Sequence, residues 1–505
     1  MLQVVTNINS AINNVVWGWP AIILLAVVGV LMTVLTKVFQ LTHIKHWWKN
    51  TIGAIFKDKN VTGHTKDKSI SQFQSLCTAL AATVGTGNIV GVAGAIIVGG
   101  PGAVFWMWLI AFFGMMTNYS ENVLGIYYRR KNKNGEWSGG AMYYLQDGLG
   151  AKKGCKGLGK VLAVLFAVFC FLASFGIGNM TQVNSISGNL LSVFNIPTWV
   201  TGILVLVLAG LVIVGGLKRI ANVTEKIVPF MVILYIVGAI IILIVNISQV
   251  PAVFGAIFKG AFAWKAAGGG VVGYGIKLAI EQGCKRGVFS NEAGLGSSVM
   301  VHSNSNVKEP VRQGMWGIFE VFADTIIVCT LTAFAVLSSG LVDLETGVTV
   351  TEYAGEAISK SNIVATVFSM HFGTIGGAFV AIAIALFAYS TILGWSHYGT
   401  KSFEYLFGEK YTIIYRVIFV IAIFGGAVMG DNLAWDIADT LNGLMMIPNL
   451  IAVLVLSPQV MRITQNYVDR KLRGKDIEPM LSVFPDIQAE HAAEIKNAET
   501  EEAAE

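Results

Sequence analysis

Long apolar runs separated by short polar segments follow one another along most of the 505-residue chain. The runs are continuous and reach about 20 residues, the length of an α-helix that crosses a bilayer, and they lack the period-two alternation of barrel strands. The pattern predicts an all-α bundle of about eleven transmembrane helices. Their expected bounds are 16–38, 73–98, 104–127, 160–186, 198–216, 227–245, 268–299, 314–338, 363–395, 413–429 and 437–456.

Composition agrees with a membrane environment. Hydrophobic residues make up 54% of the chain and charged residues 13%, with a mean hydropathy of +0.65. These values exclude a water-soluble globular protein and indicate a multi-pass protein whose surroundings are the lipid bilayer. The five cysteines are scattered without a CxxC pair, so no metal centre, disulfide framework or cofactor is predicted.

Basic residues predict which loops face the cytoplasm, because lysine and arginine are retained on that side of a membrane. Loop 41–70 is rich in lysine and loop 129–160 in lysine and arginine, whereas 341–359 is acidic. The alternation predicts a cell-membrane protein with its N-terminus outside and its C-terminus in the cytoplasm. The inner loops account for the net charge of +5, so a nucleic acid is not expected as a partner.

The run 82–91, ATVGTGNIVG, interrupts the second span with glycine, threonine and asparagine. Backbone N–H and C=O groups must be paired in hydrocarbon, so an unwound stretch survives there only inside protein or beside a cavity. Residues 83–88 are therefore predicted to break the helix and form a site. Freed amides of the second half-helix suit a carboxylate, and freed carbonyls of the first half suit a sodium ion. The alternative is a packing seam of Gly87 and Gly91.

A second interrupted segment, 268–298, is apolar yet contains charged residues and many glycines. Charges at that depth must face water, a ligand or each other. With the first span set aside, the remaining ten form two sets of five that each open with a broken helix and have opposite topology, as in inverted-repeat transporters. The expected divisions are 1–70 for the first helix and basic loop, 71–250 and 251–458 for the two repeats, and 459–505 for a cytoplasmic tail, which is expected to be solvated or partly disordered from residue 476 onward.

Four stretches distributed along the chain are GVFSNEAGLGSS at 287–298, ATVGTGNIVGVAGAI at 82–96, GNMTQVNS at 178–185 and LGWSHYG at 393–399. Together they closely resemble the alanine or glycine:cation symporter family, also called sodium:alanine symporters. The resemblance covers essentially the whole chain. It implies a leucine-transporter-type fold of two inverted five-helix repeats preceded by one extra helix, and symport of a small neutral amino acid with sodium as the coupling ion.

The resemblance and the half-helix argument together assign the substrate carboxylate to the amides of 85–87 beside Asn88. The side-chain amide of Gln182 is a further donor, the amino group is assigned to a second break at 281–283, and Trp395 is expected to wall the pocket. The alternatives are an interhelical bond for Gln182, an ion pair with Lys277 or Lys285 for Glu281, and an interfacial anchor for Trp395. The residues assigned to the substrate are Gly85, Thr86, Gly87, Asn88, Gln182, Glu281, Gln282, Gly283, Thr391 and Trp395.

The sodium site is expected where the ninth span meets the first break, because sodium is a hard cation that prefers oxygen ligands. Adjacent hydroxyls occur there in YSTILGW. The alternative for both hydroxyls is a bond to the preceding turn of their own helix. The residues assigned to sodium are Ala82, Thr83, Gly85, Ser390 and Thr391.

Charged residues further suggest an intracellular gate. Glu320 and Asp324 lie one turn apart on the eighth span, and Lys285 and Arg286 are expected on the cytoplasmic half of the seventh. Alternatively, both carboxylates face the inner vestibule. Three rival functions stay open at this point: an ion channel, proton coupling through Glu281, and uptake of a larger substrate such as glutamine. An enzyme is not expected, since no constellation of a nucleophile and a base is evident, and the oligomeric state is not predicted.

Overall fold

The computed structural model describes residues 2–65, 67–262, 272–429 and 431–504. Within them, eight helices are long and apolar enough to cross a membrane, or nine if the bent pair 72–83 and 86–99 counts as one span. Three shorter apolar helices lie at 198–213, 247–262 and 363–372. Part of the expected seventh span, 268–271, lies outside the described residues, so the count of eleven stays a prediction.

The first half of the chain contains α1 (Leu2–Val16), α2 (Trp19–Leu35), α3 (Phe39–Thr42), α4 (Ile44–Asn50), α5 (Ile52–Ile55), α6 (Lys59–Thr62), α7 (Gln72–Thr83), α8 (Val90–Gly99), α9 (Gly102–Tyr127), α10 (Ala141–Tyr143), α11 (Lys156–Phe175), α12 (Thr181–Phe194), α13 (Thr198–Ile213) and α14 (Gly216–Val245). The second half contains α15 (Val250–Phe262), α16 (Val272–Asn291), α17 (Val299–His302), α18 (Pro310–Val321), α19 (Thr330–Leu337), α20 (Ile363–Phe372), α21 (Thr374–Phe407), α22 (Thr412–Val428), α23 (Asp431–Lys471) and α24 (Pro485–Ala504). Two small antiparallel hairpins pair β1 (Arg130–Lys131) with β2 (Trp137–Ser138) and β3 (Glu352–Tyr353) with β4 (Glu356–Ala357).

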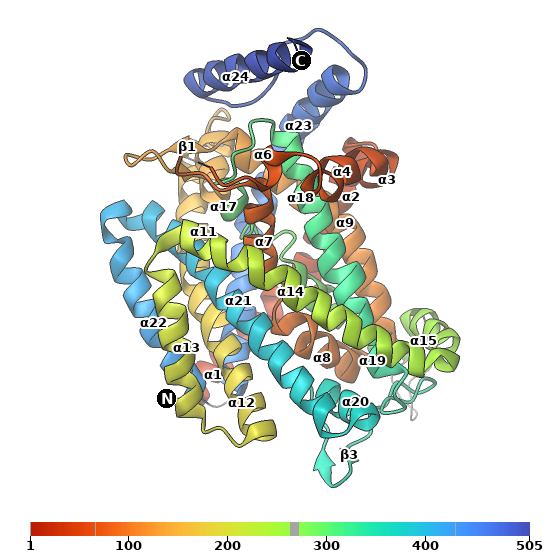
Figure 1. Ribbon diagram of the computed structural model, residues 1–505. Helices are drawn as coiled ribbons and strands as arrows, with labels where there is room; N and C mark the ends of the chain where they lie inside the picture. Colours follow the sequence, from red (N-terminus) through yellow and green to blue (C-terminus); the bar gives the residue numbers. More distant parts are fainter. Residues whose placement is uncertain (1, 66, 263–271, 430, 505) are drawn as a thin grey trace.

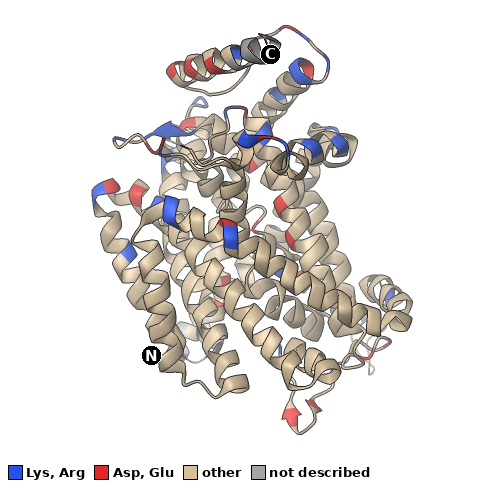
Figure 2. Ribbon diagram, in the orientation of Figure 1, with Lys and Arg blue, Asp and Glu red and all other residues tan. Residues whose placement is uncertain are grey.

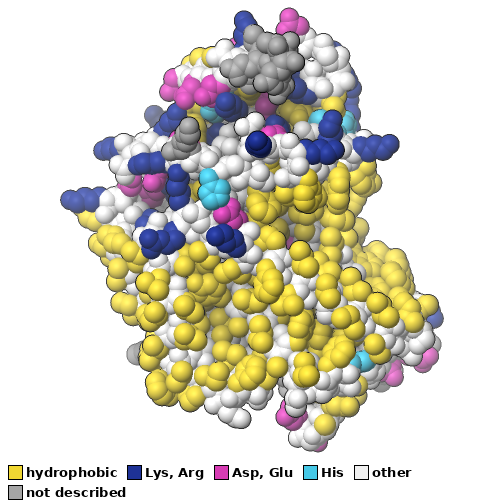
Figure 3. All heavy atoms as spheres, in the orientation of Figure 1, with side chains coloured by type: hydrophobic (Ala, Val, Ile, Leu, Met, Phe, Trp, Pro, Cys, Tyr) yellow, Lys and Arg dark blue, Asp and Glu magenta, His cyan; other side chains and the backbone are white. Residues whose placement is uncertain are grey.

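The outer helices carry an apolar belt around the bundle. Figure 3 shows hydrophobic side chains over the lower part of the visible face and lysine and arginine above them, near the end where the chain terminates (Figure 2). Leu211, Ile233 and Ile421 of α13, α14 and α22 are more than 60% exposed. Such side chains are stable outside the core only because lipid surrounds them.

The first predicted break is confirmed. A capping box starts α7, in which Gln74 N donates to Ser71 Oγ over 3.1 Å and Ser71 N donates to Gln74 Oε1 over 3.2 Å. The helix ends at Thr83, a single tight turn covers Thr86–Asn88, and the axis bends by 58° before it continues to Gly99. The broken helix is buried in protein and packs against α14 and α21, which is where unpaired backbone can be tolerated.

The second break exists but lies further along the chain than expected. The segment α16 continues without interruption through 281–283 and ends at Asn291. The chain then turns through Glu292, Gly294 and Gly296, whose φ angles are +57°, +93° and +71°, before α17 begins at Val299. The prediction of a break at 281–283 was wrong, because left-handed φ angles that end the helix are adopted only at these later positions.

The prediction of one continuous helix over 363–395 was also wrong. It consists of α20 and α21, which meet at Gly373 with a φ of +60°. A residue in this left-handed region terminates a helix, and glycine adopts it without steric cost. The chain therefore folds back at Gly373, and α21 runs on from Thr374 to Phe407 as one long helix.

The tail was predicted to be solvated or partly disordered, and for its described part this was wrong. Val483 N donates to Tyr127 O over 3.0 Å, and Leu481 and Ile487 are buried. On α24, Glu490 pairs with Lys131 and Glu494 pairs with Lys308 at 2.8 and 2.9 Å. The tail docks because one face of α24 is apolar enough to be buried and the other carries acids opposite basic loops, and Figure 1 shows it lying across the end of the bundle.

The tail should dock in a pH-dependent way through His491, which is 4% exposed and stacks edge-on against Trp137. Burial, together with the charges of Arg129, Lys308 and Lys131, lowers the pKa of His491 from 6.5 to about 3. The docked tail therefore needs a neutral imidazole, so docking is complete above the free value of 6.5 and weakens by up to about tenfold per pH unit as the pH falls toward the docked value.

Docking of the tail is measured by hydrogen–deuterium exchange of α24 at about pH 7.5 and about pH 5.5, with each rate corrected for the intrinsic exchange rate. We expect protection to fall at the lower pH. His491→Gln, which cannot titrate, should remove the difference, and an equal loss of protection in this variant would contradict the assignment.

Close approach of α21 to the broken helix depends on Gly394. A Cβ at this position would lie 2.8 Å from Ala82 Cβ and 2.9 Å from Ala82 N. Gly394→Ala should force the helices apart and cost about 1–3 kcal/mol, since overpacked cores pay that amount in displaced backbone. A thermal unfolding midpoint measured in detergent should drop by several degrees. Gly188→Ala on α12, where a Cβ meets nothing within 4 Å, is the matched control and should leave the midpoint unchanged or higher.

Candidate substrate and cation site

The two breaks meet at the buried carboxylate of Asp324, which lies in a π-helical turn, Phe322–Cys329, between α18 and α19. Asn88 Nδ2 from the first break donates to Asp324 Oδ1 over 2.6 Å, and Ser290 Oγ from the end of α16 donates to Oδ2 over 2.8 Å. A Cβ on Gly87 would lie 3.3 Å from the Phe289 ring. Asp324 thus holds the two broken helices together at one point.

The backbone amides of the first break are reached by side-chain oxygens. Asn88 Oδ1 accepts from Gly85 N over 2.9 Å. Gln182 Oε1, from α12, accepts from Thr86 Oγ1 over 3.1 Å and from Thr86 N over 3.4 Å, while its Nε2 donates to Ile177 O. The structure therefore brings Gln182 to the predicted place, but with its oxygen rather than its amide nitrogen toward the break.

Four oxygens gather between α21 and α7. The hydroxyl oxygen of Thr391 lies 3.0 Å from the carbonyl oxygens of both Ala81 and Phe387, and the hydroxyl oxygen of Ser390 lies 2.8 Å from Phe387 O and 3.4 Å from Ala81 O. Both hydroxyls thus contact their own helix and the broken one. Ala81 and Phe387 were missed from the sequence because a backbone carbonyl has no residue signature.

The other residues assigned to sodium are placed differently. Thr83 Oγ1 donates back to Ala79 O over 3.3 Å, Ala82 packs beneath Gly394, and Thr83 O accepts from Gly85 N over 2.9 Å. Gly85 itself faces the cluster, since a Cβ on it would overlap Thr391 Oγ1 and come within 3.4 Å of Gln182 Oε1. Gly85 therefore lies between the oxygen cluster and Gln182.

Trp395 forms a buried wall beside the breaks rather than an interfacial anchor. Its side chain is fully buried, and its Nε1 donates to Glu292 Oε1 over 2.8 Å. Ser297 Oγ donates to Glu292 Oε2 over 2.5 Å, and Gly178 leaves the space that the indole fills. Glu292 was evident in the sequence only as one polar residue of the second interrupted segment.

The predicted group 281–283 lies apart from this cluster. Glu281 Oε1 is 3.7 Å from Lys277 Nζ in an i,i+4 pair, and Gly283 packs against Trp106 of α9. Gln282 packs against Gly99. With a rise of 1.5 Å per residue, Glu281 lies about 15 Å along α16 from the break at Asn291.

The intracellular gate expected from Lys285 and Arg286 was wrong. Both side chains pair with Asp439 of α23, at 2.8 and 3.2 Å, and Lys285 also donates to Asn13 of α1. Asn13 belongs to α1, which lies at the end of the bundle that holds the N-terminus (Figure 1). The carboxylates of Glu320 and Asp324 bond instead to uncharged donors inside the bundle.

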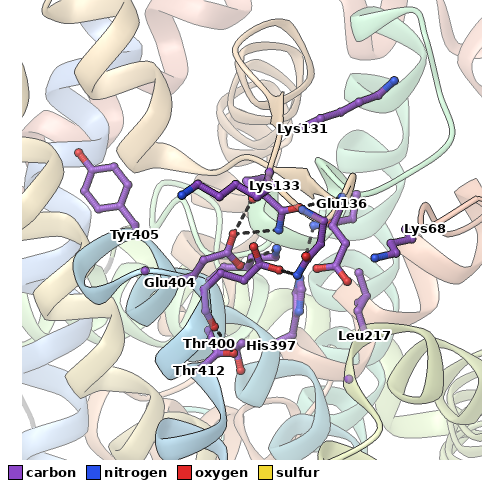
Figure 4. Close-up of a pocket in the computed structure, with 18 of the residues that line it drawn as sticks. Lys68, Lys131, Lys133, Glu136, Leu217, His397, Thr400, Glu404, Tyr405 and Thr412 are labelled. Atoms are coloured by element: carbon purple, nitrogen blue, oxygen red, sulfur yellow. Dashed lines mark hydrogen bonds and ion pairs between the residues drawn. The ribbon is translucent and has the colours of Figure 1, made fainter.

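A cavity of about 1210 Å³ opens at the opposite end, among the basic loops. Figure 4 shows residues from α21 on its wall, including His397, Thr400 and Glu404, with Lys133 and Glu136 of the β1–β2 hairpin across from them. His397 lies two residues beyond Trp395 on α21. The bundle is therefore closed by ion pairs on one side of the two breaks and hollowed on the other.

The model of the sodium:alanine symporter family matches residues 2–480. The chain belongs to the sodium:alanine symporter family. It is 42% identical to the sodium/alanine symporter AgcS of Methanococcus maripaludis, over 92% of this chain and 98% of that protein. It is 36% identical to the probable sodium/glutamine symporter GlnT of Bacillus subtilis, over 94% and 93% of the two chains.

Among solved structures, MhsT in complex with L-phenylalanine superposes with a TM-score of 0.52 over 79% of this chain and 99% of that one, at 15% identity. The fold is the leucine-transporter type expected from the sequence. Membership of the sodium:alanine symporter family makes this chain a multi-pass membrane transporter of the cation-coupled amino-acid class, and not an enzyme.

Removing the carboxylate of Asp439 should open the closed end. Asp439 is 3% exposed and balances two cations, and breaking such a buried pair costs about 3–5 kcal/mol because it leaves charge uncompensated. In Asp439→Asn, we expect maleimide labelling of the buried neighbour Cys284 to speed up about tenfold, read by peptide mass spectrometry.

The half-buried Cys155 serves as the internal reference for reagent activity. Glu352→Gln, an exposed acid of β3 outside this cluster, is the control variant. Equal labelling rates at Cys284 in both variants would show that the pair does not hold this end closed.

Proposed function

We propose that this protein takes up a small neutral amino acid, alanine or glycine, together with sodium across the cell membrane. The observation that carries the proposal is the oxygen cluster in which Thr391 Oγ1 lies 3.0 Å from Ala81 O and Phe387 O beside the hydroxyl of Ser390. A sodium ion prefers oxygen ligands of this kind. Such an ion would join α21 to the broken helix, so its binding and the shape of the break would depend on each other.

The carboxylate of the substrate is proposed to bind where Gln182 Oε1 now accepts from Thr86 N and Oγ1. At this position two donors, Thr86 N and Thr86 Oγ1, already point toward one acceptor oxygen. The amino group would face the carbonyl end of α16 near Asn291, because the C-terminus of a helix carries partial negative charge. This replaces the assignment to 281–283, whose residues lie about 12–15 Å away along α16.

The wall residues favour a small substrate. Trp395 is held rigidly by Glu292 and fills the space beside Gly178, while Gly85 leaves no room for a Cβ against Thr391. The relative AgcS is a sodium/alanine symporter. GlnT is a probable sodium/glutamine symporter, so glutamine is the second candidate.

The two ends of the bundle support alternating access. The Asp439 pairs close the end that holds the N-terminus, and the large cavity opens among the basic loops. Since basic loops are retained in the cytoplasm, we infer that the N-terminus is outside, that the C-terminus is cytoplasmic, and that the described state faces inward. Movement of the two repeats, 71–250 and 251–458, about the site would then expose it to the outside.

Uptake of labelled alanine by proteoliposomes tests the proposal. An inward sodium gradient should drive saturable uptake that unlabelled glycine competes for, and a proton gradient alone should not. Thr391→Val and Ser390→Ala should each raise the sodium concentration for half-maximal uptake about tenfold or more, which corresponds to losing about 1.4 kcal/mol of binding.

Ser396→Ala is the matched control. It is a buried serine of the same helix whose hydroxyl donates to Leu393 O of its own helix, so its loss should leave sodium dependence unchanged. Uptake of glutamine but not alanine would favour the second candidate, and equal effects of all three substitutions would contradict the sodium site.

A further inference from the structure

A buried polar cluster centred on Glu320 is not used by the site described above. Glu320 of α18 and His302 of α17 are both 0% exposed, and His302 Nε2 lies 2.9 Å from Glu320 Oε2. Asn118 Nδ2 from α9 donates to the same oxygen over 3.3 Å. The cluster therefore places a carboxylate next to an imidazole deep in the bundle, where neither group meets water.

Hydrogen bonds from neighbouring side chains orient the ring of His302. Val307 N donates to Ser305 Oγ over 3.4 Å, so the Ser305 hydroxyl donates in turn to Gln313 Oε1 over 2.8 Å. This orients Gln313 Nε2 toward His302 Nδ1 at 2.5 Å, which makes Nδ1 an acceptor. The ring proton then lies on Nε2 and is donated to Glu320. His302 thus supplies a hydrogen bond but no positive charge.

Glu320 consequently lacks a counter-charge. Its second oxygen, Oε1, is buried and has no donor in the part of the chain that the structure describes. Besides His302, the described groups that interact electrostatically with Glu320 are Glu121 of α9, Glu292, Asp324 and the phenol of Tyr398, and all four are acidic. The residues of α7 that face this region are uncharged: Ser75 approaches His302, and Gln72 accepts from Trp316. The cation Arg470 of α23 pairs with Glu309 at the other end of α18.

Burying an ionised carboxylate with an unpaired oxygen is unfavourable, so the site favours a state in which a cation neutralises it. A second buried acceptor without a donor supports the same conclusion. Asn122 Oδ1, linked to Glu320 through Asn118 by two hydrogen bonds, is a buried acceptor with no described donor. Unpaired acceptors at this depth call for a hydrogen-bond donor or a cation.

The geometry favours a proton. A metal ion needs several oxygen ligands, but the groups that contact Glu320 are the donors Asn118 Nδ2 and His302 Nε2. The helices are also too close for a hydrated ion, since a Cβ on Gly317 would lie 2.5 Å from Asn118 Oδ1 and Asn122 Nδ2. A proton needs only one lone pair, which Glu320 Oε1 offers.

We propose that Glu320 binds and releases one proton, with His302 as its positioning residue. A proton from water adds to Oε1, forms an O–H bond and removes the negative charge of the carboxylate; on release it returns to water. Proton binding stands on the cluster alone. Its coupling to transport rests on the proposed function, in which α18 carries Glu320 and leads into the turn that holds Asp324 at the two breaks.

Infrared difference spectroscopy tests proton binding without any need for transport. Spectra of the purified protein between about pH 5 and about pH 9 should contain a protonated-carboxyl carbonyl band that is missing in Glu320→Gln. Glu121→Gln replaces the neighbouring carboxyl group of α9 with a neutral amide and leaves Glu320 in place, so the Glu320 band should remain. Glu352→Gln in the exposed β3 strand is the matched control and should keep the native band.

Identical spectra for the native protein and Glu320→Gln would overturn the proposal, because they would show that Glu320 neither binds nor releases a proton between these pH values. The link to transport is measured with a pH dye inside proteoliposomes during sodium-driven alanine uptake. Alanine should move protons in the native protein and none in Glu320→Gln, with uptake itself retained. If the band is present but no alanine is taken up, the proposed function is contradicted and the proton site is supported. If alanine is taken up but the band is missing, the proton site is contradicted and the proposed function is supported.

Discussion

Every part of the site depends on one constraint: a backbone that is unwound inside a membrane must find partners in the protein. The first break meets this requirement with side chains, since Asn88 accepts from Gly85 N and Gln182 accepts from Thr86. Asp324 then ties both breaks to the turn after α18. The residues that make the break tolerable are therefore those that a substrate would have to displace or join, and this is why stability and binding share the same groups.

The same requirement sets how closely the helices approach. Gly394 lets α21 lie against Ala82, and Gly178 lets Trp395 fill the space beside the breaks. The indole is then fixed by Glu292, a charge that belongs to the second break. Close packing and buried polar contacts thus act together. The glycines let the backbones approach closely, and the carboxylates of Glu292 and Asp324 hold the neighbouring segments in place.

Charged side chains are distributed unevenly along the length of the bundle. Lysine and arginine gather at the end with the cavity, where α24 lies across the loops, and a compact group around Asp439 closes the other end. Between them the bundle holds buried carboxylates with uncharged donors. An unbalanced interior of this kind is costly in a low-dielectric medium, so its groups respond to any cation that reaches them. In the proposed function, this responsiveness couples the ion to the substrate.

The sequence by itself determined the membrane environment, the first break and the family, because hydropathy, backbone pairing and the motifs around 82–96 and 287–298 are local properties. It also pointed to Gln182, Ser390, Thr391 and Trp395, which the structure brings to the first break. Only the tertiary structure decided that Ala81 O and Phe387 O join the oxygen cluster, since a carbonyl oxygen leaves no trace in residue type. It alone placed the second break at Glu292 rather than 281–283, paired Lys285 and Arg286 with Asp439, and docked the tail. In each case the deciding contact joins segments far apart in the chain, and its energy comes from burial that no local pattern records.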